Sequence, residues 1–100
     1  MTKTTQEIIS EIKSHMAQCG GNYSDWYVGI ATDPKDRLFN NHNVDEKNGV
    51  WIYREAEDSS FARGIEDYFV NTLKTDGGTG GGDCSSQYVY AYKKTSYTNE

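Results

Sequence analysis

Three short runs of strand-forming residues, each preceded by a helical pattern, constrain the fold most. Residues rich in the β-branched and aromatic side chains that strands favour occupy 26–31 (Trp-Tyr-Val-Gly-Ile-Ala), 50–54 (Val-Trp-Ile-Tyr-Arg) and 88–92 (Tyr-Val-Tyr-Ala-Tyr). The order along the chain is therefore helix and strand in alternation. We expect an α+β domain in which a small three-stranded sheet, mixed or antiparallel, is flanked by three helices.

The expected helices are defined by capping residues and by apolar residues at helical spacing. Caps are expected at Thr4 with Glu7 for the first helix, at Asp33 with Pro34 for the second and at Asp58 for the third. Gly20 is expected to end the first helix, and Asn43 the second. The apolar face of the third helix is expected to comprise Phe61, Ile65, Tyr68, Phe69 and Leu73.

The length of 100 residues fits one domain and excludes a second independent core. We expect an N-terminal helix within 1–22, a core over 26–74, a glycine-rich loop over 76–87 and a C-terminal strand over 88–94. The glycine-rich stretch lacks the lysine and hydroxyl residue of a nucleotide-binding loop. It is either a flexible loop over a functional site or a plain connector.

The charge of the chain argues against several classes of protein. Acidic residues outnumber basic residues by 15 to 10, which gives a net charge of −5. A nucleic-acid-binding protein normally carries a basic stripe, so tight nonspecific binding to duplex DNA is not expected. Neither a membrane-spanning apolar run nor a signal peptide is visible. Cys19 and Cys84 form no metal-binding or disulfide pattern, and a cytoplasmic location fits best.

Four residues are candidates for chemistry once the elements are placed: Tyr27, Arg37, His42 and Glu66. Each also has an ordinary role open to it, as a strand aromatic, a surface cation, a histidine at a helix end or an ion-paired helix residue. Gly29 lies inside the first strand, where a glycine indicates that another group comes close to its backbone. Glu66 lies beside the apolar face of its helix, where a partly solvated carboxylate requires a partner or a metal.

Taken together and in order, these residues resemble the GIY-YIG nuclease superfamily over roughly 26–74. Tyr27-Val28-Gly29 stands in place of the YIG half-motif, and Thr32 and Arg37 follow at the family's usual spacing, before His42. The segment Ala62-Arg63-Gly64-Ile65-Glu66 is similar to the family's Ala-x-x-x-Glu helix.

The resemblance implies a role for each residue. Tyr27 would position or activate the attacking water, and Arg37 would steady charge on the scissile phosphate. Glu66 would bind one divalent metal ion, Mg²⁺ or Mn²⁺. His42 matches a position that some members use as a general base or as support.

The sequence departs from the family because no GIY strand precedes Tyr27, and the first helix occupies that place. The run 88–92 looks more like the missing strand than anything upstream does. We therefore expect a rearranged sheet in which 88–92 lies beside 26–31. This strand would bring Tyr90 or Tyr88 to the site.

The implied function is a metal-dependent endonuclease that acts on DNA. Substrate contacts are expected at Gly29, Lys93 and Lys94. Because the chain is acidic, its own affinity for DNA would be weak, and a protein partner would supply the rest. The alternative is a non-catalytic binding module with the same fold, whose acidic surface docks on a basic protein partner.

Overall fold

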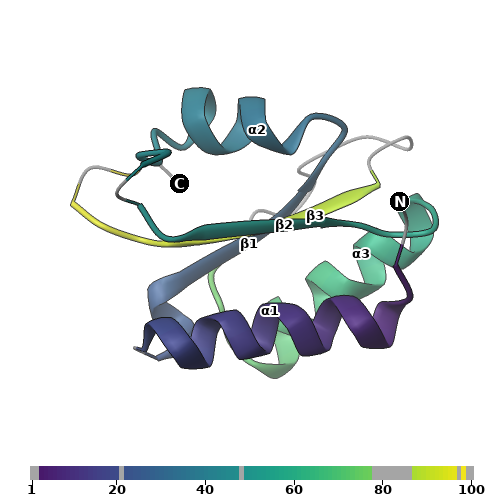
Figure 1. Cartoon of the computed structure of the whole chain (residues 1–100). Coiled ribbons are helices and arrows are strands. Elements are labelled where there is room, and N and C mark those ends of the chain that lie inside the picture. The colour runs from purple at the N-terminus through teal and green to yellow at the C-terminus, as the bar shows by residue number, and fades with distance from the viewer. Residues whose placement is uncertain (1–2, 21, 48, 78–86, 97, 99–100) are drawn as a thin grey trace.

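The computed structural model describes residues 3–20, 22–47, 49–77, 87–96 and 98 as an α+β domain (Figure 1). In chain order the elements are α1 (Thr5–Cys19), the 3₁₀ turn η1 (Tyr23–Asp25), β1 (Trp26–Ala31), α2 (Pro34–Asp36) continued by the π turn η2 (Arg37–Asn41), β2 (Trp51–Glu55), α3 (Ser59–Asp67) continued by the π turn η3 (Tyr68–Thr72), and β3 (Tyr88–Lys93). The expected three helices and three strands are confirmed. No helix in the described part of the chain has the length and apolarity to cross a membrane.

The last strand of the chain lies in the middle of the sheet. The strand order is β1-β3-β2, and β3 pairs antiparallel with both neighbours. One row of the register joins Gly29, Tyr90 and Tyr53 across the three strands. The expected pairing of 88–92 with 26–31 is therefore confirmed, and the sheet is antiparallel throughout.

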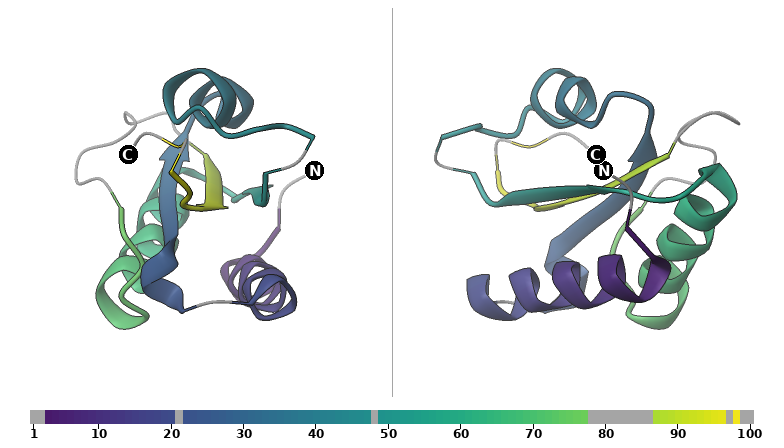
Figure 2. Two further views of the ribbon diagram at one scale, coloured as in Figure 1. Left: turned by 90° about the vertical axis from the view of Figure 1, so that its left-hand side faces the viewer. Right: turned by 45° about the vertical axis from the view of Figure 1, so that its right-hand side comes forward.

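Helices cover both faces of the sheet, with α2 on one face and α1 and α3 on the other (Figures 1 and 2). Alternation along the strands divides the side chains between these faces. The core under α1 and α3 is mainly aliphatic and surrounds Trp26 and Phe69. The smaller core on the α2 face consists of Tyr27, Ala31, Leu38, Val44, Tyr90 and Tyr92. Tyrosine hydroxyls are thus concentrated on the α2 face.

The expected capping residues begin their helices. Thr4 Oγ1 accepts a hydrogen bond from Glu7 N at 3.2 Å, and Glu7 Oε1 accepts one from Thr4 N at 3.0 Å, which completes the capping box of α1. The carboxylates of Asp33 and Asp58 accept bonds from backbone amides in the first turns of α2 and α3. These starts depend on residues three positions apart, so they are visible in the sequence.

One residue of the expected apolar face of α3 does not belong to it. Phe61 is 47% exposed, whereas Ala62, Ile65 and Phe69 are fully buried and Glu66 is 6% exposed. Successive helical residues turn by about 100°, so Phe61 lies about 90° from the centre of the buried face. Glu66 thereby takes a buried position instead of the boundary position that the sequence indicates.

The segment after η3 lies along the outer edge of β1. Asp76 forms a parallel bridge with Tyr27, and its backbone bonds to Trp26 O at 2.8 Å and Val28 N at 2.9 Å. Residues 78–86 of the expected glycine-rich loop, including Cys84, lie outside the described residues. The thiol of Cys19 is free.

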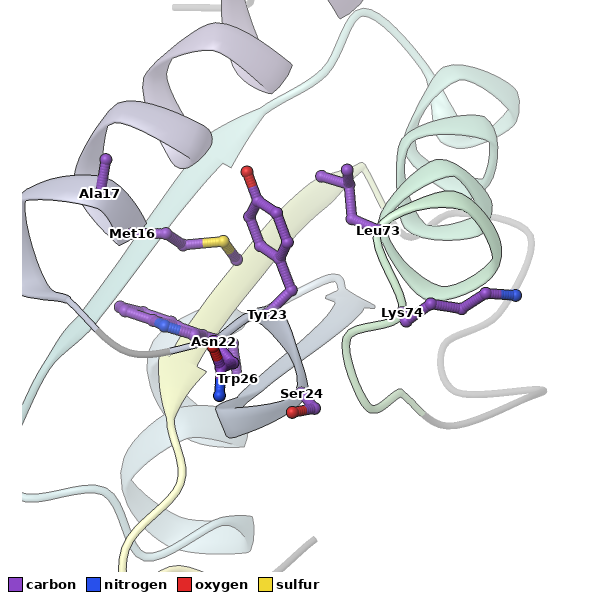
Figure 3. A pocket seen from close by; sticks show the side chains of 8 residues that line it. All are labelled: Met16, Ala17, Asn22, Tyr23, Ser24, Trp26, Leu73 and Lys74. Atoms are coloured by element: carbon purple, nitrogen blue, oxygen red, sulfur yellow. The ribbon is translucent and has the colours of Figure 1, made fainter.

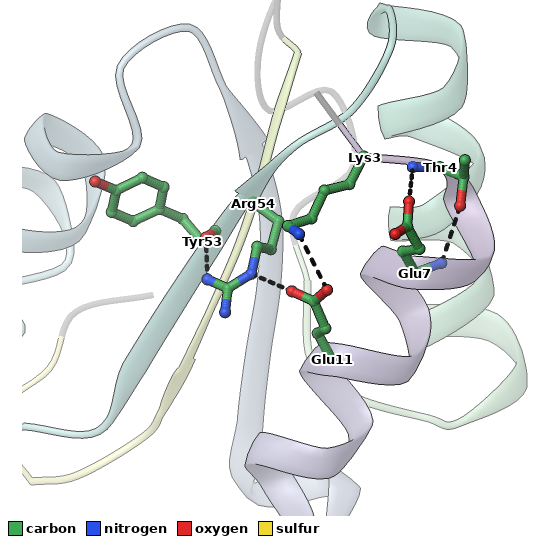
Figure 4. A network of polar contacts seen from close by, with 6 residues as sticks. All are labelled: Lys3, Thr4, Glu7, Glu11, Tyr53 and Arg54. Atoms are coloured by element: carbon green, nitrogen blue, oxygen red, sulfur yellow. Dashed lines mark hydrogen bonds and ion pairs between the residues drawn. The ribbon is translucent and has the colours of Figure 1, made fainter. Parts of the chain in front are cut away.

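Charged residues link the start of the chain to α1 and β2 (Figure 4). Lys3 forms a parallel bridge with Ala56, just after β2. Its ammonium lies 3.3 Å from Glu11 of α1, and the Arg54 guanidinium lies 2.5 Å from the same carboxylate. Because these side chains are about one third exposed, each ion pair contributes no more than about 1 kcal/mol.

Candidate active site

The Tyr90 ring lies directly over Gly29. Tyr90 is opposite Gly29 in the β1–β3 register. A Cβ atom at position 29 would come within 2.7 Å of Tyr90 Oη and 2.8 Å of Tyr90 Cζ, closer than carbon atoms pack. The close approach expected from a glycine inside a strand is therefore confirmed, and the approaching group is a tyrosine hydroxyl.

A π turn connects Arg37 with His42. The backbone N–H of His42 donates to Arg37 O at 2.9 Å, which closes an i→i+5 turn. Insertions of this kind are frequent at functional sites. The Arg37 side chain is half-buried and the His42 side chain is buried.

His42 is bonded at both ring nitrogens by buried tyrosines. Its Nε2 lies 2.7 Å from Tyr90 Oη, and its Nδ1 lies 3.1 Å from Tyr92 Oη. The Tyr27 ring packs against the same imidazole, with ring centroids 4.7 Å apart. His42 is 6% exposed, Tyr90 2% and Tyr92 0%. The four rings form one cluster between the sheet and α2.

The carboxyl group of Glu66 is buried, which is unfavourable for its charged form. Its Oε2 is buried and has no hydrogen-bond partner within the described structure. Burial, together with the neighbouring Asp67, raises the pKa of Glu66 to about 7 against the opposing effect of Arg63. The carboxyl group therefore lacks the partner that a buried charge requires.

Three candidate side chains are in contact beside Gly29. The Tyr90 ring lies over Gly29, its hydroxyl is bonded to His42, and the Tyr27 ring lies 6.3 Å from the Tyr90 ring between centroids. The pKa of Tyr90 is raised chiefly by burial and further by Tyr27 and Glu66, while Arg37 lowers it. Arg37 and Glu66 come from η2 and α3, and their link to this cluster is this electrostatic effect.

The remaining candidates lie elsewhere. Tyr88 packs edge-to-face against Tyr53, with ring centroids 6.0 Å apart, so Tyr90 is the tyrosine that the third strand brings to this cluster. Lys94 forms an ion pair with Asp76 at 3.2 Å. Lys93 is half-buried at the end of β3, opposite Trp26 in the register, three residues along the strand from Tyr90.

The donor atoms fit a divalent cation that a substrate helps to hold. Among the described residues, no group of three or more His, Cys, Asp or Glu side chains lies together. Mg²⁺, however, is commonly bound through one or two carboxylates, with waters and substrate phosphates as the other ligands. The unpartnered, buried Oε2 of Glu66 is a donor of this type.

Sequence reasoning missed Tyr92 as a member of the cluster. The alternation of 88–92 places Tyr88, Tyr90 and Tyr92 on one face, and this pattern was the available signal. It does not say which tyrosine reaches a histidine 48 or 50 positions away. Tyr90 and Tyr92 are both buried in the cluster.

A separate pocket of about 460 Å³ lies between the end of α1, η1 and the end of η3 (Figure 3). Its lining residues are Met16, Ala17, Asn22, Tyr23, Ser24, Trp26, Leu73 and Lys74. Trp26 belongs to the core on the opposite face of the sheet from Tyr90. This pocket therefore includes none of the candidate residues.

No protein-family model, curated protein or solved structure matches the chain.

Proposed function

We propose that this protein is a GIY-YIG-like endonuclease that hydrolyses phosphodiester bonds of DNA with the help of one divalent cation. The observation that carries the proposal is the cluster beside Gly29, in which Tyr27 and His42 pack against Tyr90 and His42 bonds its hydroxyl; Arg37 and Glu66 both shift the pKa of that hydroxyl. Tyrosine, arginine and glutamate are also the residue types of the family motif that the sequence resembles. The central position of β3 supports the idea that this strand replaces the missing GIY strand.

In the proposed hydrolysis, each side chain of the site has a role that suits its chemistry. Arg37 offers a rigid, permanently charged donor fork for the scissile phosphate. The described residues provide no ion-pair partner for this guanidinium. Tyr27 and Tyr90 orient the attacking water, and His42 holds the Tyr90 hydroxyl at 2.7 Å.

Glu66 is the residue that would hold Mg²⁺ or Mn²⁺. When bound, the cation neutralises charge on the phosphoryl oxygens. Since the pKa of Glu66 is about 7, a proton competes for the carboxylate at neutral pH. Affinity for the cation is therefore expected to rise between pH 6 and pH 8.

A plasmid-nicking assay tests the proposal. Purified protein is incubated with supercoiled DNA and Mg²⁺ or Mn²⁺ at low salt, because an acidic chain binds DNA weakly. Glu66→Ala and Arg37→Ala should each reduce the nicking rate by about 100-fold or more. The matched controls are Glu57→Ala and Lys35→Ala, which remove exposed residues of the same charge and should leave the rate unchanged. Equal rates in all five proteins would refute the proposal.

A second candidate function is favoured by the burial of Tyr90, His42 and Glu66 together with the net charge of −5. In this alternative the fold is a non-catalytic module, and its acidic surface docks on a basic protein partner. It predicts no nicking at any metal concentration. It also predicts that Mg²⁺ leaves the melting temperature unchanged, since a ligand that binds the folded state would raise it.

A further inference from the structure

The imidazole of His42 is held by two tyrosines of the same strand. Tyr90 and Tyr92 are two positions apart on β3, so their side chains project from the same face of the sheet. Tyr90 Oη lies 2.7 Å from Nε2, and Tyr92 Oη lies 3.1 Å from Nδ1. All three side chains are buried, so this arrangement is fixed by packing.

With a neutral imidazole, the two hydrogen bonds of His42 can be arranged in two ways. A neutral imidazole has one N–H donor and one acceptor nitrogen, so one tyrosine donates to the ring and the other accepts from it. In one state Tyr90 donates to Nε2 and Nδ1–H donates to Tyr92; in the other both directions are reversed. Only the first state leaves a lone pair on Nε2 that can take the proton of the Tyr90 hydroxyl.

We propose that Tyr92 is a positioning residue that holds His42 in the tautomer whose Nε2 lone pair faces the Tyr90 hydroxyl. The proposal rests on the proposed function and adds to it the route of one proton. As the attacking water forms its bond to phosphorus, its proton moves to Tyr90 Oη. The hydroxyl proton of Tyr90 moves at the same time to His42 Nε2. The leaving oxygen departs with the electron pair of the broken P–O bond and takes a proton from solvent.

Two further observations agree with this route. Burial and nearby negative charge raise the pKa of Tyr90, so a free tyrosinate is unfavourable and a direct transfer to His42 avoids it. The imidazolium that forms keeps its Nδ1–H bond to Tyr92, so no hydrogen bond of the ring has to break. Tyr92 bonds the other ring nitrogen, Nδ1, and acts only through the ring.

The test combines ring ¹⁵N NMR with the nicking assay. Spectra of the wild type, with His42 assigned by comparison with His15→Gln, should show Nδ1 protonated and Nε2 unprotonated. In Tyr92→Phe the ring should lose this preference, and kcat should fall at least tenfold with KM unchanged. Tyr53→Phe removes a hydroxyl from the same face and should change neither the spectrum nor the rate.

Two results would overturn the assignment: a wild-type ring protonated at Nε2, or a Tyr92→Phe ring with an unchanged tautomer. The wild-type tautomer is read without any substitution at Tyr92, so a wild-type ring protonated at Nε2 refutes the assignment even where Tyr92→Phe fails to fold. The NMR result also does not depend on activity. A wild type with the expected tautomer but without nicking would count against the proposed function and for the positioning role of Tyr92.

Discussion

At the scale of single residues, Tyr90 is the side chain on which the candidate site depends. Its hydroxyl bonds to His42 and lies over Gly29, and the charge of Glu66 raises its pKa. A glycine inside a strand costs about 0.5–1 kcal/mol, and a buried carboxylate without a partner is also unfavourable. Unfavourable local features of this kind are expected at functional positions, where a residue is retained for its function and not for its contribution to stability.

Replacing Gly29 by alanine should destabilise the fold by about 1–3 kcal/mol. The new Cβ would come within 2.7 Å of the Tyr90 hydroxyl oxygen, so the ring would have to move. Urea unfolding followed by circular dichroism measures the change. Gly64→Ala is the matched control, because its Cβ would meet nothing within 4 Å. On α3 this alanine should stabilise by up to about 1 kcal/mol. Equal effects of the two substitutions would contradict the close packing at Gly29.

Glu66 should make stability depend on pH. Its pKa rises from an ordinary 4.5 to about 7 on folding, so between these values the folded state binds the proton more tightly than the unfolded state does. Stability should therefore be highest below pH 4.5, fall by up to about 3 kcal/mol as the pH rises to 7, and then level off. This contribution adds to those of the other titrating groups.

Glu66→Gln isolates that contribution, because glutamine is uncharged at every pH. Urea titrations at pH 5 and pH 8 should show that the variant gains stability relative to the wild type at the higher pH. Glu57→Gln, at an exposed position, should follow the wild type. Parallel pH responses of Glu66→Gln and the wild type would show that the Glu66 carboxyl group has the same pKa in the folded and unfolded states, contrary to this prediction.

At the scale of elements, the two π turns explain what the sequence could and could not predict. Helix starts at Thr4, Asp33 and Asp58 were predictable, because a cap and its amide lie within three residues of one another. Nothing in the residues of η2 or η3 indicates that their hydrogen bonds shift from the fourth to the fifth preceding carbonyl. The backbone bond from His42 N to Arg37 O therefore became visible only in the structure.

The capping box of α1 gives a prediction at this scale. Thr4→Ala removes the oxygen that accepts from Glu7 N and should destabilise the protein by about 0.5–2 kcal/mol. Thermal unfolding measures the loss. Ser10→Ala, at an exposed position within α1, should be neutral or slightly stabilising, because alanine is the better helix former. A loss for Ser10→Ala as large as that for Thr4→Ala would show that the cap contributes nothing specific.

At the scale of the whole molecule, the order β1-β3-β2 separates two strands that are closer to one another in sequence than either is to the third. The pattern of 88–92 predicted a strand and a neighbour for it, but not that this strand has partners on both sides. The sequence also did not determine whether the sheet is mixed or antiparallel. Pairing of this kind depends on contacts between residues 33 to 67 positions apart, which no local pattern encodes.

Removing β3 should abolish the fold. A chain that stops after residue 86 leaves β1 and β2 without the strand that lies between them, and both helical layers lose their common support. Circular dichroism and urea unfolding should show no cooperative transition. A chain that stops after residue 96 keeps β3 and the Lys94–Asp76 ion pair and should still unfold cooperatively. A folded 1–86 chain would contradict the central role of β3.

The central position of β3 also sets when the protein can fold during its synthesis. Until residues 88–93 leave the ribosome, β1 and β2 lack the strand that pairs with both of them, and Val89 and Ala91 are missing from the core. Exposed strand edges and apolar surface promote aggregation. We therefore expect the domain to complete its fold only after β3 has been synthesised, and a chain cut short before that point to be degraded.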